Sequence, residues 1–345
     1  MKFMTSPLVD IVIPAWNRCD MTFQCLEHLY ALDAGAPFRV ILVDNGSKDR
    51  TRSILRWYKA NTKPWVPWAR RKGFDLKTLH LRHNLGFARA NNLGAERGNA
   101  RWLLFMNNDA FPANQGWLRL LLLQARACSW DAIGPVSDNV LGIQDQKWNR
   151  SFPSAHEAKF LSGFCLLVSR NAFESVGGWD DEFLNGDEDL DLCIRLRKSG
   201  FTLGVNREVF VRHICSQTMH NFVAAYKMTI QEWFANTRDQ LLRKHGAAWH
   251  EDLFQWEQYN RPPEEWRAIG VLPNGRFFQL PGSRRAQVSA IRGLYPRKRQ
   301  SGTGVPDAGL YSRYSLDTGP GNAFVCRCGG PCAGTGTRAV ACAGA

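Results

Sequence analysis

The stretch Trp102-Leu103-Leu104-Phe105-Met106-Asn107-Asn108-Asp109 decides how the chain is organised. Its first part is apolar, as expected of a parallel strand that is buried on both faces. The apolar run ends abruptly in two carboxamides and a carboxylate. These three side chains would lie at the carboxyl end of the strand, where open α/β sheets bind ligands. Asn and Asp also end strands in ordinary turns, so this stretch alone fits a turn equally well.

Further apolar runs on both sides of this stretch also end in polar residues. Strands are expected at 9–14, 38–43, 76–81, 161–168, 201–205 and 209–213. Helical spacing predicts a helix capped by Asp20 and others around 54–58, 91–94, 114–128 and 187–196. Alternating strands and helices predict an α/β fold, with a Rossmann-like, mostly parallel sheet flanked by helices.

Four segments fall outside this alternation. Residues 61–76 combine Trp, Pro and basic residues and are interpreted as a surface insertion, and 137–158 as a mobile polar loop. Residues 221–245 are expected to form one long amphipathic helix. Beyond about residue 262 the chain is rich in Pro, Gly and Arg, for which little fixed structure is expected. The predicted division is therefore a domain at 1–218, a helical extension at 219–261 and a disordered tail at 262–345.

The net charge of +13 is concentrated near the C-terminus. Residues 281–345 hold nine Lys or Arg and two Asp or Glu. Basic surface attracts phosphates of any kind, but no recognised nucleic-acid-binding motif is present, so nucleic acid is not a favoured partner. No apolar run approaches the ~20 residues that span a bilayer, and no export signal is apparent. With cysteines scattered through the body, a cytoplasmic protein with reduced thiols is expected.

The polar residues at the strand ends suit a nucleoside diphosphate. Asp44 could bond a base or a ribose hydroxyl, and Gly86 would let the backbone approach a ligand closely. Asp109 could hold a divalent metal between two phosphates. Four acidic residues at 187, 188, 189 and 191 exceed what helix capping requires, so Asp189 or Glu188 could act as a general base. Neither G-x-x-x-x-G-K-[ST] nor G-x-G-x-x-G occurs.

Taken together, these motifs resemble the glycosyltransferases of family 2, which have the GT-A fold, and among them the rhamnosyltransferase-like members. The resemblance spans about residues 9–216, in the order of that family. The matching pieces are Val12-Ile13-Pro14-Ala15-Trp16-Asn17, Val43-Asp44-Asn45-Gly46-Ser47, Asn84-Leu85-Gly86-Phe87-Ala88 with Asn91-Asn92, Asn107-Asn108-Asp109, Gly178-Trp179-Asp180, Glu188-Asp189-Leu190-Asp191-Leu192 and His213.

This resemblance implies an inverting transfer of a sugar from a nucleotide-sugar donor to an acceptor hydroxyl, on a saccharide or a lipid-linked glycan. It assigns the catalytic base to Asp189, with Glu188 beside it, and a Mg²⁺ or Mn²⁺ site to Asp109 and His213. The residues expected near the nucleotide sugar are Pro14, Trp16, Asn17, Asp44, Asn45, Asn84, Gly86, Asn91, Asn107 and Asn108. Those expected near the acceptor or the transferred sugar are Ser162, Gly163, Trp179, Asp180 and Asp191.

Several alternatives stay open. The family more often has Asp where this chain has Asn107, so its metal site would carry less negative charge and bind metal more weakly. His213 fits a structural histidine as well as a ligand, and Trp16 and Trp179 fit packing better than sugar stacking. The 221–245 helix could dock to a lipid-linked acceptor at the inner face of the membrane. A nucleotidyltransferase would need a glycine-rich loop, yet residues 14–20 contain no Gly. A protein that binds nucleic acid through its basic tail is the other rival.

Overall fold

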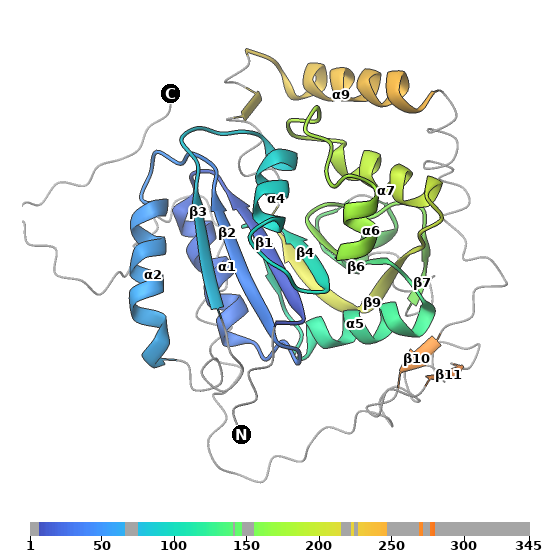
Figure 1. Ribbon diagram of the computed structural model, residues 1–345, viewed down its shortest axis with the longest axis horizontal. Coiled ribbons are helices and arrows are strands. Elements are labelled where there is room, and N and C mark those ends of the chain that lie inside the picture. The colour runs from blue at the N-terminus through green and yellow to red at the C-terminus, as the bar shows by residue number, and fades with distance from the viewer. Residues whose placement is uncertain are drawn as a thin grey trace, which may run out of the picture. The chain divides into compact units, whose positions relative to one another are not determined.

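The computed structural model describes residues 7–65, 75–140, 142–146, 155–214, 222–223, 227–246, 269–271 and 277–279. The chain divides into two compact units, Met1–Pro296 and Arg297–Ala345. The second unit lies outside the described residues, so everything below concerns the first (Figure 1). The predicted tail at 262–345 also lies outside them, except for a short antiparallel hairpin of β10 (Ile269–Val271) and β11 (Phe277–Gln279).

The described residues contain one large mixed sheet with helices on both faces. Its strand order is β3-β2-β1-β4-β8-β6-β9-β5, and β7 pairs with β9. The strands are β1 (Val9–Ala15), β2 (Phe38–Asp44), β3 (Asp75–His80), β4 (Trp102–Met106), β5 (Ala110–Pro112), β6 (Ala132–Val136), β7 (Ala155–Ala158), β8 (Cys165–Ser169) and β9 (Leu203–His213). The helices are α1 (Cys19–Ala31), α2 (Thr51–Trp65), α4 (Phe87–Ala95), α5 (Trp117–Cys128), the 3-10 helix η1 (Gly142–Gln144), α6 (Arg170–Ser175), α7 (Glu188–Lys198) and α9 (Ile230–His245).

Strand β4 is buried on both faces, as its apolar run predicted. Leu104 and Met106 belong to the core that includes side chains of α1 and α5. Leu103 and Phe105 belong to the opposite core, which includes side chains of α4, α6 and α7. Successive strand residues point to opposite faces, so helices cover both sides of the sheet (Figure 1).

The strand order reverses between β1 and β4. The chain runs outward from β1 through the parallel strands β2 and β3, and then returns to place β4 in parallel on the other side of β1. The loops that follow β1 and β4 therefore diverge at their carboxyl ends, which is where open α/β sheets form a ligand crevice. Asn107, Asn108 and Asp109 directly follow β4 at this place.

Strand β8 runs antiparallel to both of its neighbours, β4 and β6. Met106 pairs with Cys165, so the start of β8 lies beside the end of β4. The segment that enters β8, with Ser162 and Gly163, is thereby brought to the same edge as Asp109. The parallel arrangement predicted from the sequence holds for β1 to β4 and for the pair β6 and β9.

Two predicted helix boundaries are wrong. Asp20 does not cap the first helix: α1 begins at Cys19, and its N-cap residue is Arg18 in the left-handed region with φ 51°. Asp20 instead lies in the first turn and pairs with Arg18, with 2.9 Å between Nη2 and Oδ2. The predicted 221–245 helix is interrupted: Phe222 and Val223 are helical, residues 227–229 are not, and α9 begins at Ile230. Thr229 and Glu232 form a capping box there, which satisfies the free backbone N–H groups of the first turn.

Two predicted strands, 201–205 and 209–213, are one strand, β9. The polar residues at 206–208 look like a turn in the sequence, but they form an irregularity in the pairing with β6. Asn206 Oδ1 accepts hydrogen bonds from the N–H groups of Glu208 and Val209, at 2.9 and 3.2 Å. This side chain replaces the missing strand partner, which lets β9 continue to His213.

Two segments predicted to be irregular contain regular structure. Helix α2 extends to Trp65, into the predicted surface insertion at 61–76, of which 66–74 lie outside the described residues. The predicted loop at 137–158 contains η1 and β7, and β7 is antiparallel to β9. Residues 147–154 of that loop are not described.

Candidate active site

The residues that follow β4 are fixed by contacts to two other strands. The N–H of Asn107 donates to the carbonyl of Phe164 at 2.9 Å, just before β8. The carbonyl of Asp109 accepts from the N–H of Ile214 at 3.1 Å, just after β9. Asp109 is 6% exposed. This tripeptide is therefore a rigid part of the sheet edge.

His213 faces this tripeptide from the end of β9. Its Nε2 lies 3.4 Å from Asp109 Oδ1 and 3.2 Å from Asn107 Nδ2. Its Nδ1 lies 3.1 Å from the carbonyl oxygen of Asn139. A carbonyl can only accept, so the hydrogen of this contact lies on Nδ1, and Nε2 faces Asn107 and Asp109. The ring also stacks on Phe164, with 4.9 Å between centroids.

These groups suit a cation that is bound together with a substrate. The described residues contain no group of three or more His, Cys, Asp or Glu side chains that could hold a metal ion. Asp109 and His213 supply two donors, and the neutral Asn107 lies beside them. Mg²⁺ and similar cations complete such sets with water and substrate phosphates. The backbone carbonyl on Nδ1 is also the usual support of a histidine ligand.

Asp44 ends β2 and is held by several groups. Its Oδ1 accepts from the N–H of Ser47 at 2.9 Å, and its Oδ2 lies 3.0 Å from His80 Nδ1. Arg52 Nε lies 3.7 Å from the same Oδ2. His80 ends β3, directly opposite Asp44 in the strand pairing. His80 was not among the predicted site residues, although a polar residue at the end of a strand beside Asp44 was a usable signal.

Asn45 holds the loop that carries Asn84 and Gly86. Its Nδ2 donates to Asn84 Oδ1 at 2.8 Å and to the carbonyl of Gly86 at 3.0 Å. Gly86 has φ 85°, and a Cβ there would lie 2.4 Å from the carbonyl oxygen of Leu184. Glycine is therefore required, because the backbone passes close to the loop that precedes α7.

The loop after β1 is tied to the loop after β2. Asn17, with φ 56°, donates its N–H to Ser47 Oγ at 2.8 Å, and its Oδ1 accepts from the N–H of Lys48 at 2.9 Å. Trp16 is half-buried and packs edge-on against Phe222, with 6.2 Å between centroids. Pro14 lies within β1. These residues lie at the carboxyl ends of β1 and β2, as Asp44 does.

The acidic pair begins α7. Asp189 Oδ2 accepts from the N–H of Gly163 at 2.8 Å, and Oδ1 accepts from the N–H of Leu190 at 2.9 Å. The Glu188 carboxylate accepts from the N–H of Gly186. Glu188 is only 7% exposed, whereas Asp189 is half-buried.

Burial raises the pKa of both acids. The pKa of Glu188 is raised further by the negative charges of Asp189 and Asp187. The N–H of Gly163 partly offsets the effect of burial on the pKa of Asp189, and the charge of Asp187 adds to it. A raised pKa brings a carboxylate nearer to the range in which a general base works best.

The two halves of the site meet through two consecutive residues. The N–H of Gly163 donates a hydrogen bond to the Asp189 carboxylate. The carbonyl of Phe164 accepts one from the N–H of Asn107, and the Phe164 ring stacks on His213. The structure thus brings the predicted base and the predicted metal ligands, which are distant in the sequence, to one edge of the sheet.

Other predicted site residues support the crevice from within. Trp179 is buried and packs edge-on against Phe87 and Phe105. Asn108 is buried and donates to Thr22 Oγ1 at 2.9 Å. The remaining members are held by hydrogen bonds or ion pairs: Asn91 bonds the Phe87 carbonyl, the N–H of Ser162 bonds Gln144, and Asp180 and Asp191 both pair with Lys244.

With this geometry in place, comparison with known proteins identifies the domain. Residues 10–177 match the model of the family described as Glycosyl transferase family 2. This segment is a family 2 glycosyltransferase domain. Glu188, Asp189 and His213 lie outside the matched residues, so their assignment depends on the geometry described above.

Two relatives of the family 2 domain are named for O-antigen biosynthesis and for rhamnosyl transfer. The O-antigen biosynthesis protein RfbC of Myxococcus xanthus is 25% identical over 228 residues, which are 56% of this chain and 16% of that protein. The N-acetylglucosaminyl-diphospho-decaprenol L-rhamnosyltransferase of Mycobacterium tuberculosis is 49% identical over 49 residues, which are 14% of this chain and 16% of that enzyme. The chain thus spans a small part of either relative.

A solved structure supports the fold. The mannosyltransferase of Pyrobaculum calidifontis, in complex with GDP-Man and Mn²⁺, superposes with a TM-score of 0.52. The identity is 16%, and the match covers 90% of this chain and 80% of the other. At this identity the likeness shows the fold alone, which is GT-A, as the motifs implied. Across the described residues, no helix has the length and apolar character needed to cross a membrane.

Proposed function

We propose that the protein is an inverting glycosyltransferase that moves a sugar from a nucleoside-diphosphate sugar to an acceptor hydroxyl. The observation that carries this proposal is the link from Asp189 through Gly163 and Phe164 to Asn107, which sets a carboxylate beside the residues that follow β4. A base and a diphosphate site must lie on the two sides of one reacting carbon, and this link holds both to one sheet edge.

The nucleoside end of the donor is assigned to Asp44 and its neighbours. The Asp44 carboxylate is buried and oriented by Ser47 and His80. A base or ribose hydroxyl bound beside it would donate to one of the remaining lone pairs of this carboxylate. Gly86 holds the neighbouring loop in place through its close contact with the Leu184 backbone. The diphosphate then falls beside Asp109, because β1 lies between β2 and β4 in the sheet and the donor would extend from the end of β2 to the end of β4. A divalent cation held by Asp109 and His213 would neutralise charge on the leaving diphosphate.

Asp189 is proposed as the general base. As the acceptor oxygen bonds to the anomeric carbon, its proton moves to the Asp189 carboxylate. The bond from that carbon to the phosphate oxygen breaks, and the electron pair leaves with the diphosphate. Attack on the face opposite the leaving group inverts the configuration. Asp189 is favoured over Glu188 because Asp189 is half-buried and can meet an acceptor, whereas Glu188 is nearly inaccessible.

For the finer specificity, we propose a hexose or a deoxyhexose such as rhamnose, transferred to a saccharide or lipid-linked glycan during polysaccharide biosynthesis. The names of the two relatives support this choice. Mg²⁺ and Mn²⁺ are both compatible with the donor atoms of Asp109 and His213. A lipid-linked acceptor would place the reaction in the cytoplasm, with the enzyme peripheral at the inner face of the membrane.

The proposal is tested with the purified full chain and a panel of nucleotide sugars, each with Mg²⁺, Mn²⁺ or EDTA. Release of nucleoside diphosphate is measured with and without saccharide and polyprenyl-diphosphate-saccharide acceptors. We expect one donor to give acceptor-dependent release that EDTA abolishes, and a product of inverted anomeric configuration by NMR. A product that retains the donor's configuration would contradict the proposed mechanism.

A further inference from the structure

Helix α9 packs against the segment that carries the candidate base. Trp233, Thr237 and Leu241 recur every fourth residue and are buried. Leu241 shares a small apolar core with Phe183, Leu190 and Ile194, of which the last two belong to α7. An α-helix has about 3.6 residues per turn, so residues four apart lie close to one face. Through these three residues, α9 therefore presents one buried stripe to the first turns of α7 and to the loop before it.

Two side chains of α9 hold Asp187, the residue just before Glu188. Thr237 Oγ1 donates to Asp187 Oδ2 at 2.6 Å, and Arg238 Nε lies 2.8 Å from the same oxygen. Asp187 is buried and has φ 62°, a conformation that non-glycine residues rarely adopt. Such a conformation persists when surrounding contacts enforce it, and two of these contacts come from α9.

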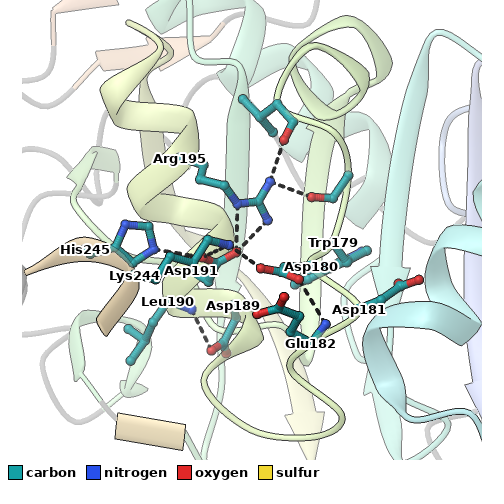
Figure 2. A network of polar contacts seen from close by, with 12 residues as sticks. Trp179, Asp180, Asp181, Glu182, Asp189, Leu190, Asp191, Arg195, Lys244 and His245 are labelled. Carbon is teal, nitrogen blue, oxygen red and sulfur yellow. Dashed lines mark hydrogen bonds and ion pairs between the residues drawn. The ribbon is translucent and has the colours of Figure 1, made fainter. Parts of the chain in front are cut away.

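Two more side chains of α9 hold Asp191, one turn further along α7 (Figure 2). Asp191 is 0% exposed. Its Oδ1 lies 2.7 Å from Lys244 Nζ and 2.8 Å from His245 Nε2, and its Oδ2 lies 2.7 Å from Arg195 Nε. Burial alone would raise the pKa of Asp191, but Arg195, Lys244 and His245 outweigh it and lower that pKa. Asp191 is therefore ionised and bound.

Lys244 also pairs with Asp180, so one ammonium group joins α7 to the loop that precedes it. Figure 2 shows Lys244 between Asp180 and Asp191, while the Asp189 carboxylate points away from them. Within the described part of the chain, neither Glu188 nor Asp189 forms an ion pair. The four acids thus fall into two kinds: Asp187 and Asp191 anchor α7 to α9, whereas Glu188 and Asp189 form no ion pair with a described residue.

We propose that α9 is a positioning element of the active site, with Lys244 and Thr237 as its principal positioning residues. This inference rests on the proposed function, because it assumes that Asp189 is the base. A base displaced by a fraction of an ångström transfers its proton less well. The donor site is formed by the ends of β1, β2 and β4. Of α9, Trp233 packs in the cluster that includes Trp16 after β1, whereas Lys244 and Thr237 contact other parts of the chain. Loss of the Lys244 contacts therefore lowers turnover more than donor binding.

The test compares Lys244→Gln with Arg243→Gln. Both residues are exposed cations in the last turn of α9. Lys244 pairs with Asp180 and Asp191, whereas Arg243 forms no ion pair with any described residue. For Lys244→Gln we expect kcat to fall about 10-fold or more, with the donor KM within about 2-fold of wild type. Lys244→Arg should recover most of the loss, and Arg243→Gln should match wild type. Equal kcat in Lys244→Gln and Arg243→Gln, or a raised donor KM at unchanged kcat, would overturn the proposal.

A second measurement does not depend on activity. Hydrogen exchange of peptides covering 180–191 is compared in wild type, Lys244→Gln, Arg243→Gln, Thr237→Val and Thr237→Ser. Valine keeps the shape of Thr237 and removes its hydroxyl, whereas serine keeps the hydroxyl. Faster exchange in Lys244→Gln and Thr237→Val, but not in Thr237→Ser or Arg243→Gln, supports positioning by α9. Unchanged exchange in both former variants overturns it. If wild type transfers no sugar at all, the proposed function fails while this measurement still decides the role of α9.

Discussion

The Asp189 carboxylate accepts a hydrogen bond from the backbone N–H of Gly163, with 2.8 Å between Oδ2 and N. Gly163 lies two residues before β8, whose antiparallel course brings it beside the end of β4. Through this one bond, the first turn of α7 is attached to the edge of the sheet that carries Asp109. The groups on either side of the bond can be tested one at a time.

Replacing Asp109 by Ala should remove metal-dependent binding of a nucleoside diphosphate. Asp109 provides the carboxylate of the proposed cation site, and His213 alone is a weak site for a hard cation. Calorimetric titration with UDP and GDP, with Mn²⁺ and then with EDTA, measures the effect. Binding that is the same in both proteins, with and without EDTA, would exclude the metal assignment.

Replacing Asn107 by Asp should strengthen Mn²⁺-dependent binding of the nucleoside diphosphate. The substitution adds a negative charge beside His213 Nε2, which now lies 3.2 Å from the amide nitrogen of Asn107. We expect the Mn²⁺ concentration for half-maximal binding to fall by about 10-fold, since hard cations favour carboxylates. Asn108→Asp is unsuitable as a matched control because Asn108 is buried; Asn114→Asp, outside the cluster, serves instead. An equal or higher Mn²⁺ concentration for half-maximal binding in Asn107→Asp would show that this position does not face the cation.

Replacing His80 by Ala should weaken donor binding and leave turnover nearly unchanged. His80 Nδ1 lies 3.0 Å from Asp44 Oδ2 and fixes the direction of that carboxylate. A hydrogen bond to a charged group contributes about 1.5–3 kcal/mol. Its loss should therefore raise the donor KM about 10-fold. Steady-state kinetics with the donor varied give both constants. A fall in kcat without any change in KM would place His80 outside the nucleoside site.

Replacing Glu188 by Gln should stabilise the protein at pH 8 and have little effect at pH 5. Burial raises the pKa of Glu188 in the folded state, so the folded protein holds a proton that the unfolded chain releases. Wild-type stability therefore falls as pH rises above the unfolded pKa of about 4.3, and continues to fall until the folded-state pKa is passed. We expect Gln to gain on the order of 1 kcal/mol at pH 8.

Urea denaturation at the two pH values measures this difference. Asp239→Asn, on the exposed side of α9, is the control for loss of a surface charge. An advantage of Glu188→Gln that is larger at pH 5 than at pH 8 would show that the pKa of Glu188 is lowered rather than raised.

Local patterns in the sequence were enough to predict the first half of the fold. The apolar runs of β1, β2 and β4 are long, and each ends in polar residues, so the crevice with Asp44 and Asp109 could be predicted from the order of the residues alone. These motifs occur in the order found in family 2. The family match over residues 10–177 and the GT-A fold confirm the resemblance to that family.

The rest depends on contacts between distant residues, which local patterns do not encode. The direction of β8, and with it the bond from Gly163 to Asp189, follows from packing against β4 and β6. The polar residues at 206–208 suggested a turn because the compensating role of Asn206 arises only in the sheet. The excess of acids in α7 was visible in the sequence, but their division between anchoring and chemistry required the position of α9.

The assignment of Asp189 as the base is tested most directly by the Asp189→Asn variant. Asn keeps an oxygen that can accept from the N–H of Gly163, so the link to the sheet edge is retained while the base is lost. We predict that calorimetry gives an unchanged Kd for the nucleoside diphosphate with Mn²⁺, and that kcat falls by a factor of ~100 or more. Turnover equal to wild type, with donor binding intact, would contradict the assignment of Asp189 as the base.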